Sequence, residues 1–513
     1  MSRLTKFIRQ HRHNRAQKNA DAHLSARHAK PKNINDITAE LADELYLLGD
    51  CRAEQAYFQL TSRYPKTHDF RYRLASILLE RGLIEEAEKV LSDGESIEGF
   101  PSYSASLLAA IREDKRLSKQ HPPVLSKEQR LVVLDDSFPC DLSGFRYSEF
   151  TEILKAIPQS VVLSSTWDMS RFGKSVLFEE TLDQYRKSYR DLAERVHRFT
   201  AEQNIEIDVA YSVFLNGATR LWRANPNFKT RRAVFTLYPG GGFDLNGRLS
   251  NEKLKRLCDD PRLTKIITTQ RPTYDYLLEK GFCEKGRIEH IYGGVVPPIL
   301  SQPSQLETPV PRQVSDVVNV CFVAHWYGTH RSAKGVDVFS DVVNRFSNDS
   351  RFAFHIVGEW SPELTGIRQS DNVFYYGVRS ASFFPGFYSK MDAILSPALS
   401  LFEINNGVGP FDGFPTTACA EAGAAGVAMF LTDSLGMNTD ICGRTIYKPH
   451  EEFEPIPRDA DYVCDLLSHY LNNRDDLAAL GQRGRLALLR ELGFDKQVTP
   501  RIELLRQELR LAS

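Results

Sequence analysis

The sequence has no cysteine pattern of the kind that forms a disulfide framework or a zinc site. Its eight cysteines are scattered along 513 residues, and no two of them form a Cys-x-x-Cys pair. Zinc sites and disulfide-rich secreted domains both use closely and regularly spaced cysteines. We therefore expect free thiols in a reducing compartment, and no bound metal.

Long apolar segments are also missing. No run of apolar residues approaches the roughly 20 that are needed to span a bilayer. The charged first residues are not followed by the hydrophobic segment of a secretory signal. The expected location is the cytoplasm, either free or peripherally attached to the inner face of a membrane.

The chain as a whole has no excess of charge of one sign. Its formal net charge is −1, so the overall balance gives no indication of a nucleic-acid partner. Hydrophobic residues make up 42% of the chain and aromatic residues 11%, which is enough to build buried cores. At roughly 150 residues per domain, the length suggests about three domains.

Positive charge is concentrated at the start. Residues 1–32 hold nine Lys or Arg, four His and a single acid, Asp21. We expect a disordered, solvated basic tail. The alternatives are an electrostatic tether to an anionic membrane surface and a contact with nucleic acid. Because the complete chain is nearly neutral, no nucleic-acid partner is predicted.

Residues 33–120 are rich in Ala and Leu in a helical pattern. Gly49 and Gly82, 33 residues apart, each close an apolar helix, and Pro65 ends a helix between them. This spacing resembles the tetratricopeptide repeat, whose period is about 34 residues. Either the helices form a docking surface for a protein partner, or they are a plain helical hairpin that packs on the rest of the chain.

Two series of alternating strands and helices follow, separated by the proline-rich segment Val296–Val314. Short β-branched runs such as those at Leu131–Asp136 and Val318–Ala324 predict buried parallel strands. We therefore predict an α/β fold with two Rossmann-like domains that face a cleft, preceded by the small all-α region. The predicted domains cover residues 124–300 and 315–513, and the second includes the closing helices.

The most informative stretch is FDGFPTTACAEAGAAG, at residues 411–426. Thr416 is placed to cap a helix that starts near Thr417, and a helix N-terminus preceded by Gly-Phe-Pro suits a diphosphate. Glu421 lies about one turn inside that helix and can accept two hydrogen bonds from a cis-diol. Asp412 precedes the turn, where it could also be an ordinary Asp-Gly turn residue.

This stretch resembles the donor-binding signature of the retaining group 1 glycosyltransferases of GT-B fold, the glycogen-synthase-like class (family 4 type). That signature has two acids with seven residues between them, followed by Ala-x-x-x-Gly. Residues 421–426 match its second half, whereas Asp412 lies nine positions before Glu421 and is not a glutamate. The resemblance makes Glu421 the ribose-binding acid and Asp412 a catalytic acid beside the donor sugar. The resemblance also assigns the sugar-lining residues Gly413, Phe414 and Pro415 and the phosphate-binding residues Thr416 and Thr417.

Other pieces extend the resemblance upstream. Lys334, in a Lys-Gly pair, resembles the family's lysine that contacts the donor diphosphate. It counts as catalytic because a cation stabilises the leaving diphosphate. The family's arginine has no clear counterpart, and Arg331 and His325 are the candidates for it. Gly377 and Val378 resemble the loop that meets the nucleobase.

The first α/β domain is expected to bind the acceptor. The loop after its first strand resembles the family's substrate loop and supplies Gly144 and Arg146. A glycine-rich turn after a later strand supplies Gly241. Many relatives carry a histidine near that turn, where this chain has Tyr238, so no catalytic base is assigned.

The predicted function is transfer of a sugar, with retention, from a nucleoside diphosphate sugar to a glycan or lipid-linked acceptor, as in the synthesis of a lipopolysaccharide or capsule. The resemblance implies no metal and no other cofactor. Two alternatives stay open, a sugar-nucleotide epimerase on the same fold and a non-catalytic scaffold that acts through the helical repeats. Free epimerised sugar-nucleotide would indicate the epimerase. The joint presence of Lys334, Asp412 and Glu421 disfavours the scaffold.

Overall fold

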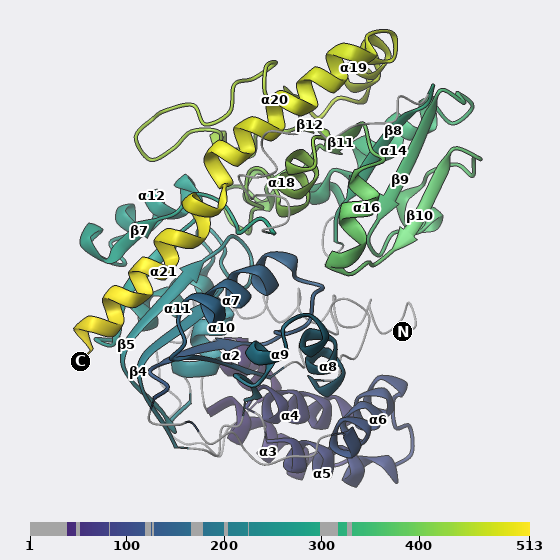
Figure 1. Cartoon of the computed structure of the whole chain (residues 1–513). Coiled ribbons are helices and arrows are strands. Elements are labelled where there is room, and N and C mark those ends of the chain that lie inside the picture. The colour runs from purple at the N-terminus through teal and green to yellow at the C-terminus, as the bar shows by residue number, and fades with distance from the viewer. Residues whose placement is uncertain are drawn as a thin grey trace.

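The computed structural model describes residues 38–47, 52–81, 83–117, 125, 128–165, 178–199, 204–223, 225–297, 316–325 and 331–512. This part of the chain consists of a small helical region and two α/β domains (Figure 1). The predicted basic tail at residues 1–32 lies outside the described residues, as does most of the proline-rich segment between the α/β domains.

The helical region consists of short helices that pack against their neighbours in sequence. Their alanines and leucines form one small core, which contains Leu74, Leu91 and Ile111. The region is attached to the first α/β domain, where the guanidinium of Arg220 lies 5.1 Å from the ring centre of Tyr46. The expected helices are present, and their relation to tetratricopeptide repeats stays a prediction. They are α2 (Ala39–Leu47), α3 (Arg52–Arg63), α4 (His68–Glu80), α5 (Ile84–Glu95) and α6 (Ser102–Leu117).

The first α/β domain is built on a parallel sheet with the strand order β3-β2-β1-β4-β5-β6-β7. Its central strands β1 and β2 are buried along their whole length, and valine and leucine side chains make up most of both. The order of the first six strands is that of a Rossmann fold, in which the order reverses between β1 and β4. The strands are β1 (Leu131–Asp135), β2 (Ser160–Ser164), β3 (Val196–Arg198), β4 (Ile205–Val213), β5 (Phe228–Leu237), β6 (Leu263–Thr268) and β7 (Ile288–His290). The helices are α7 (Gly144–Ala156), α8 (Phe178–Ser188), α9 (Arg190–Ala193), α10 (Leu215–Gly217), η3 (Ala218–Arg223), α11 (Arg248–Cys258), α12 (Arg271–Glu279) and η4 (Lys285–Arg287).

The second α/β domain repeats this order in a parallel sheet arranged β10-β9-β8-β11-β12-β13. The order therefore reverses between β8 and β11. The strands are β8 (Val318–Val323), β9 (Phe352–Val357), β10 (Val373–Gly377), β11 (Ala393–Ser396), β12 (Ala428–Leu431) and β13 (Glu454–Pro455). The helices are η6 (Arg331–Lys334), α14 (Val336–Arg345), α15 (Pro362–Thr365), η7 (Ala381–Phe383), α16 (Phe384–Tyr388), α17 (Leu401–Ile404), α18 (Thr417–Ala424) and η8 (Ser434–Gly436).

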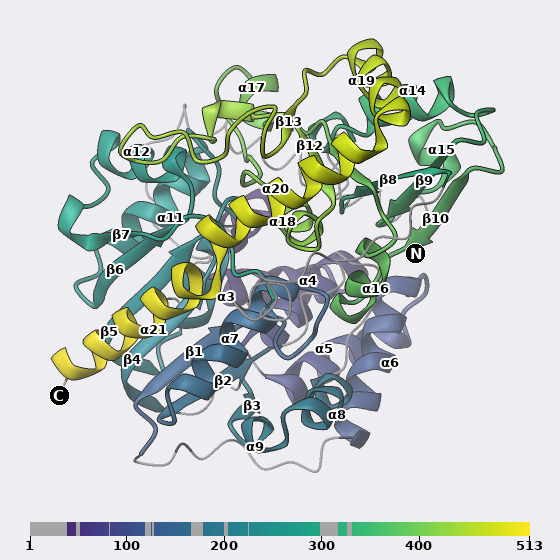
Figure 2. The same ribbon diagram turned by 45° about the horizontal axis from the view of Figure 1, so that its top comes forward.

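The closing helices do not all belong to the second domain. Helices α19 (Ala460–Asn472) and α20 (Arg474–Leu492) pack on it, whereas α21 (Phe494–Leu511) lies along the first domain (Figures 1 and 2). Ile502 and Leu505 enter the same core as Val209 of β4. The sequence-based boundary at 315–513 thus needs correction, because the apolar face of α21 is buried against the first sheet.

Two Rossmann-like sheets facing a cleft, with a small helical region before them, confirm the predicted α/β fold and its GT-B arrangement. The return of α21 to the first domain ties the two domains together. Among the helices in the described part of the chain, none combines the length and apolar character needed to cross a membrane.

Candidate active site

A cavity of about 290 Å³ lies where the strand order of the second sheet reverses. One wall is formed by the carboxyl ends of β8 and β11, including Ala324 and Ser396. The opposite wall comes from the first domain, from the segment Asp141–Phe145. The carboxyl edge at a reversal of strand order is where open α/β sheets bind ligands. The cavity is therefore the candidate active site, and both domains contribute to it.

The N-terminus of α18 opens into this cavity. The hydroxyl of Thr416 accepts a hydrogen bond from the backbone N–H of Cys419 at 3.4 Å and so caps the helix. Thr416, Thr417 and Ala418 all line the cavity. The backbone N–H groups of the first helical turn have no partners within the helix and carry partial positive charge, which suits a phosphate. The predicted cap and helix start are confirmed, and phosphate binding stays a prediction.

Lys334 and Asp412 meet at the rim of the same cavity. The Nζ of Lys334 donates to both carboxylate oxygens of Asp412, at 2.8 and 2.6 Å. Both residues line the cavity. The next residue, Gly335, packs directly on the backbone of Pro397, since it has a φ of 77° and a Cβ there would lie 2.3 Å from the Pro397 carbonyl oxygen. The lysine is thus held beside the helix N-terminus by an acid on the loop that precedes it.

Glu421 is the buried acid of the site. It is 9% exposed, and burial raises the pKa of its carboxyl group to about 7. Its Oε1 faces Gly144 of the first domain so closely that a Cβ on Gly144 would lie 3.2 Å from it. A carboxylate with so little solvation gains much from donors such as the hydroxyls of a diol.

The sugar-lining residues predicted from the signature behave differently from one another. Gly413, Phe414 and Pro415 line a small hollow of about 20 Å³ that adjoins the cavity along Asp412. The Phe414 ring, however, is 3% exposed and packs on the ring of Phe453, with the two ring centres 5.6 Å apart. The backbone of Phe414 is thus available to line the site, whereas its ring belongs to the core.

Some of the residues predicted to supply a second cation, or to form the loop that meets the nucleobase, lie at the cavity. His325 and Val378 line it. Gly377, with a φ of 68°, ends β10 just before Val378. The backbone of Arg331 begins η6, but its side chain lies outside the described residues. Arg379 also lines the cavity. The sequence did not predict it as a site residue, although it is a cation directly after Gly377 and Val378.

The acceptor residues predicted in the first domain divide in the same way. Gly144 lines the cavity. Arg146 points inward instead, is 3% exposed, and pairs with Asp135 at 3.0 Å and Asp136 at 2.5 Å. Gly241, with a φ of 56°, packs under the Phe214 ring. The structure does not bring these last two residues to the cavity, because the ion pairs and the ring contact fix them behind its wall.

Tyr238 is likewise withdrawn from the cavity. Its hydroxyl donates to Glu149 at 2.8 Å and accepts from Arg501 at 3.2 Å, in a buried network. Asp141, which the sequence reasoning missed, lines the cavity in its place. Its carbonyl accepts from the backbone N–H of Ala381 at 3.3 Å, which closes the two domains against each other at this point. Burial raises the pKa of the Asp141 carboxyl group.

No protein-family model matches the chain, and no curated protein matches it. Solved structures with a similar arrangement include sucrose-phosphate synthase from Thermosynechococcus elongatus, with 14% identity and a TM-score of 0.48, over 75% of this chain and 100% of that one. Anabaena Alr3699/HepE, solved with UDP and glucose, has 12% identity and a TM-score of 0.49, over 74% of this chain and 100% of that one. An O-GlcNAc transferase mutant from Thermobaculum terrenum has 12% identity and a TM-score of 0.43, over 100% of this chain and 99% of that one. Likenesses at these identities and scores assign no substrate, mechanism or site residue to this chain.

Proposed function

We propose that this protein is a retaining glycosyltransferase that moves a sugar from a nucleoside diphosphate sugar to a glycan or lipid-linked acceptor in polysaccharide synthesis. One observation carries the proposal. One cavity between the domains is lined by the lysine Lys334, the helix cap Thr416 and the buried acid Glu421.

Each of these groups suits one part of the donor. The first turn of α18 and Lys334 would hold the diphosphate, and Glu421 would accept hydrogen bonds from the ribose diol. As the glycosidic bond breaks, the diphosphate gains negative charge and the sugar ring gains positive charge. The lysine stabilises the first charge and Asp412 the second. Such a mechanism needs no metal and no other cofactor, because Lys334 and the N-terminus of α18 would stabilise the leaving diphosphate as a metal ion does in other enzymes.

Retention of the anomeric configuration rests on the sequence signature around residues 411–426. The acceptor would approach from the first domain, past Asp141 and Gly144. The helical region at residues 33–120 is proposed as a docking surface for a protein partner, and residues 1–32 as a contact with an anionic membrane from the cytoplasmic side. A tail of this kind would bind anionic vesicles and be released by salt, since screening acts within about 10 Å at 0.1 M.

A thermal-shift screen against UDP-, GDP-, dTDP- and CMP-sugars tests the proposal, because a ligand that binds only the folded state raises the unfolding temperature. The stabilising donor is then incubated with the protein and a glycan acceptor, and the products are separated. Sugar on the acceptor supports the proposal. Epimerised sugar-nucleotide in place of transfer would indicate an epimerase, and stabilisation by none of the donors would count against both enzymes.

A further inference from the structure

A tyrosine of the first domain reaches into the loop that carries the proposed donor site. Tyr292 follows β7, and its hydroxyl donates a hydrogen bond to the carbonyl of Phe414. Gln270, just after β6, donates from Nε2 to the same carbonyl at 3.4 Å and is 2% exposed. Two hydrogen-bond donors of the first domain therefore converge on one carbonyl of the second domain, two residues before the helix cap Thr416.

The Phe414 carbonyl, which accepts these hydrogen bonds, belongs to a segment that both domains hold in place. The Phe414 ring packs inside the second domain, with its centre 5.6 Å from that of Phe453 and 6.5 Å from that of Tyr447. Its carbonyl is held by the first domain. Asp412 and Thr416, which flank it, line the candidate active site. The shape of residues 412–416 thus depends on how the two domains sit relative to each other.

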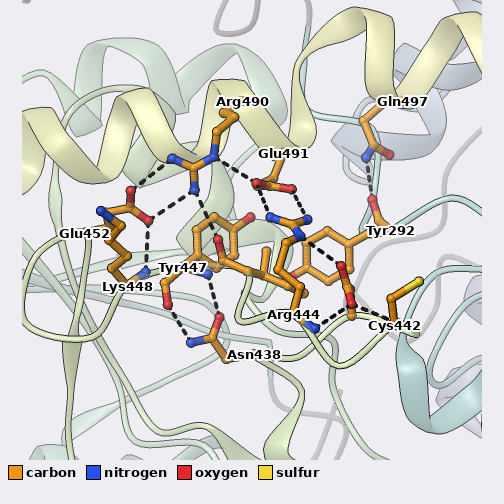
Figure 3. A network of polar contacts seen from close by, with 12 residues as sticks. Tyr292, Asn438, Cys442, Arg444, Tyr447, Lys448, Glu452, Arg490, Glu491 and Gln497 are labelled. Carbon is orange, nitrogen blue, oxygen red and sulfur yellow. Dashed lines mark hydrogen bonds and ion pairs between the residues drawn. The ribbon is translucent and has the colours of Figure 1, made fainter.

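Tyr292 is itself anchored where the chain crosses between the domains (Figure 3). Its carbonyl accepts a hydrogen bond from Gln497 of α21, and its ring centre lies 6.3 Å from that of Tyr447. The adjacent Gly293 packs on Leu492 at the end of α20, where a Cβ would come within 2.5 Å of the leucine. Burial raises the pKa of Tyr292 well above its ordinary value.

The loop that carries Tyr447 is clamped to the end of α20 by ion pairs (Figure 3). Arg444 pairs with Glu491 at 3.0 Å, and Arg490 pairs with Glu452 at 2.9 Å. Three segments therefore meet at the break between α20 and α21. They are the loop after β7, the loop before β13 and the crossing helices themselves. A change in the angle between the domains would therefore alter the contacts of Tyr292.

We propose that Tyr292, assisted by Gln270, is a positioning residue that holds the loop 412–416 in its donor-binding shape only while the two domains are closed. The inference rests on the proposed function for the identity of the ligand. When the domains part, the Phe414 carbonyl loses both donors and the loop relaxes. Donor affinity is then lowered although no group that touches the donor has been removed.

Tyr292→Phe tests this, since it removes the hydroxyl and keeps the ring. Tyr375→Phe is the matched control, because the Tyr375 hydroxyl bonds to Thr365 Oγ1 at 2.8 Å within the second domain and away from the cavity. Inorganic pyrophosphate, UDP and GDP are titrated into each protein by calorimetry. Tyr292→Phe should bind the ligands that the wild type binds about tenfold more weakly, the scale of one lost hydrogen bond. Tyr375→Phe should bind them as the wild type does.

Two further readouts separate positioning from general loosening of the fold. Tyr292→Phe should raise KM for the donor and leave KM for the acceptor unchanged. The double variant with Gln270→Ala should lose less affinity than the sum of the single variants, because both donors serve one carbonyl. Small-angle X-ray scattering should find ligand-free Tyr292→Phe more extended than the wild type.

The outcomes distinguish this inference from the proposed function. Equal ligand affinity of Tyr292→Phe and the wild type overturns the positioning role. If the wild type binds none of the three probes, the proposed function is in doubt. Scattering then still decides about Tyr292, because a variant as compact as the wild type refutes the link between the tyrosine and closure.

Discussion

The two α/β domains share the order of their first six strands, yet the places where that order reverses are filled differently. In the second domain small residues such as Ala324 and Ser396 leave a cavity at the strand ends. In the first domain Asp135 ends β1 at 2% exposure and is covered by its ion pair with Arg146. Behind that pair, Glu149 accepts from Tyr238 at 2.8 Å.

The difference shows that strand order offers a place for a ligand and side chains decide whether it is open. In the first domain the buried charge of Asp135 is paired with Arg146 inside the protein, so it serves the structure of the cavity wall. At the second reversal Glu421 is buried, and no ion pair to it is found among the residues that the structure describes. Burial raises the pKa of its carboxyl group. We therefore expect substitutions to act on stability in the first domain and mainly on ligand binding in the second.

Arg146→Ala should give the largest effect of this comparison. It removes the cation beside the buried Asp135, and breaking a buried ion pair from one side costs about 3–5 kcal/mol of folding free energy. Denaturant unfolding followed by fluorescence measures the loss. The control is Arg379→Ala, an exposed arginine at the cavity. A loss below about 1 kcal/mol for Arg146→Ala is the scale of an exposed ion pair, and would contradict the stabilising role of the buried pair with Asp135.

Glu421→Gln should stabilise the protein at high pH while weakening donor binding. The folded-state pKa of about 7 exceeds the ordinary value of 4.5, so the folded state binds more protons between these pH values and stability falls as pH rises through them. Above pH 7 the wild type carries the full penalty, at most about 3 kcal/mol, and the glutamine variant does not. Below pH 4.5 the two should be equally stable.

Unfolding curves at pH 4, 6 and 8 measure this difference. Calorimetry at the same pH values should find that nucleoside diphosphate affinity of the wild type rises with pH through 7, since the ionised carboxylate is the better acceptor. A stability difference that is the same at all three pH values would show that Glu421 is not the titrating group.

Lys334→Ala should cost about 1.5–3 kcal/mol of binding to free nucleoside diphosphate, the range of a charge-assisted hydrogen bond. Folding stability should change little, because Lys334 and Asp412 are partly exposed, with side chains 18% and 38% accessible. Calorimetry and a thermal melt of the same sample measure both quantities. Unchanged affinity in the folded variant would rule out the phosphate contact.

Asp412→Asn should have the smallest effect on binding and act on turnover. Loss of the negative charge leaves Lys334 in place, so nucleoside diphosphate affinity should hold or improve slightly. We expect kcat and kcat/KM to fall together by about tenfold, because a carboxylate is worth more once positive charge has developed on the sugar. Steady-state kinetics measures this, and full turnover would make Asp412 a turn residue that merely orients the lysine.

Much of the fold could be predicted from neighbouring residues alone. Short apolar runs rich in β-branched residues, such as Leu131–Asp135, favour buried strands, and their alternation with helices indicates parallel sheets. The cap at Thr416 and the position of Glu421 inside α18 follow from the local order of residue types. These features are local because caps and periodicity involve residues within a few positions of one another.

The rest was decided by contacts between distant parts of the chain. A sequence with Arg146 between polar and apolar neighbours does not say whether the arginine points toward a ligand or toward Asp135. The pairing of Lys334 with Asp412, the approach of Gly144 to Glu421 and the reach of Tyr292 to Phe414 all join segments that are far apart in sequence.

The sequence by itself thus determined the two α/β domains, the capped helix and the identity of the acid inside it, because each depends on short-range spacing of residue types. Tertiary structure alone decided that α21 joins the first domain, that Arg146 is neutralised in a wall, and that Asp141 and Arg379 face the cavity. The physical reason is that burial and charge pairing depend on which surfaces meet. That depends on the packing of whole domains, which no local pattern in the chain records.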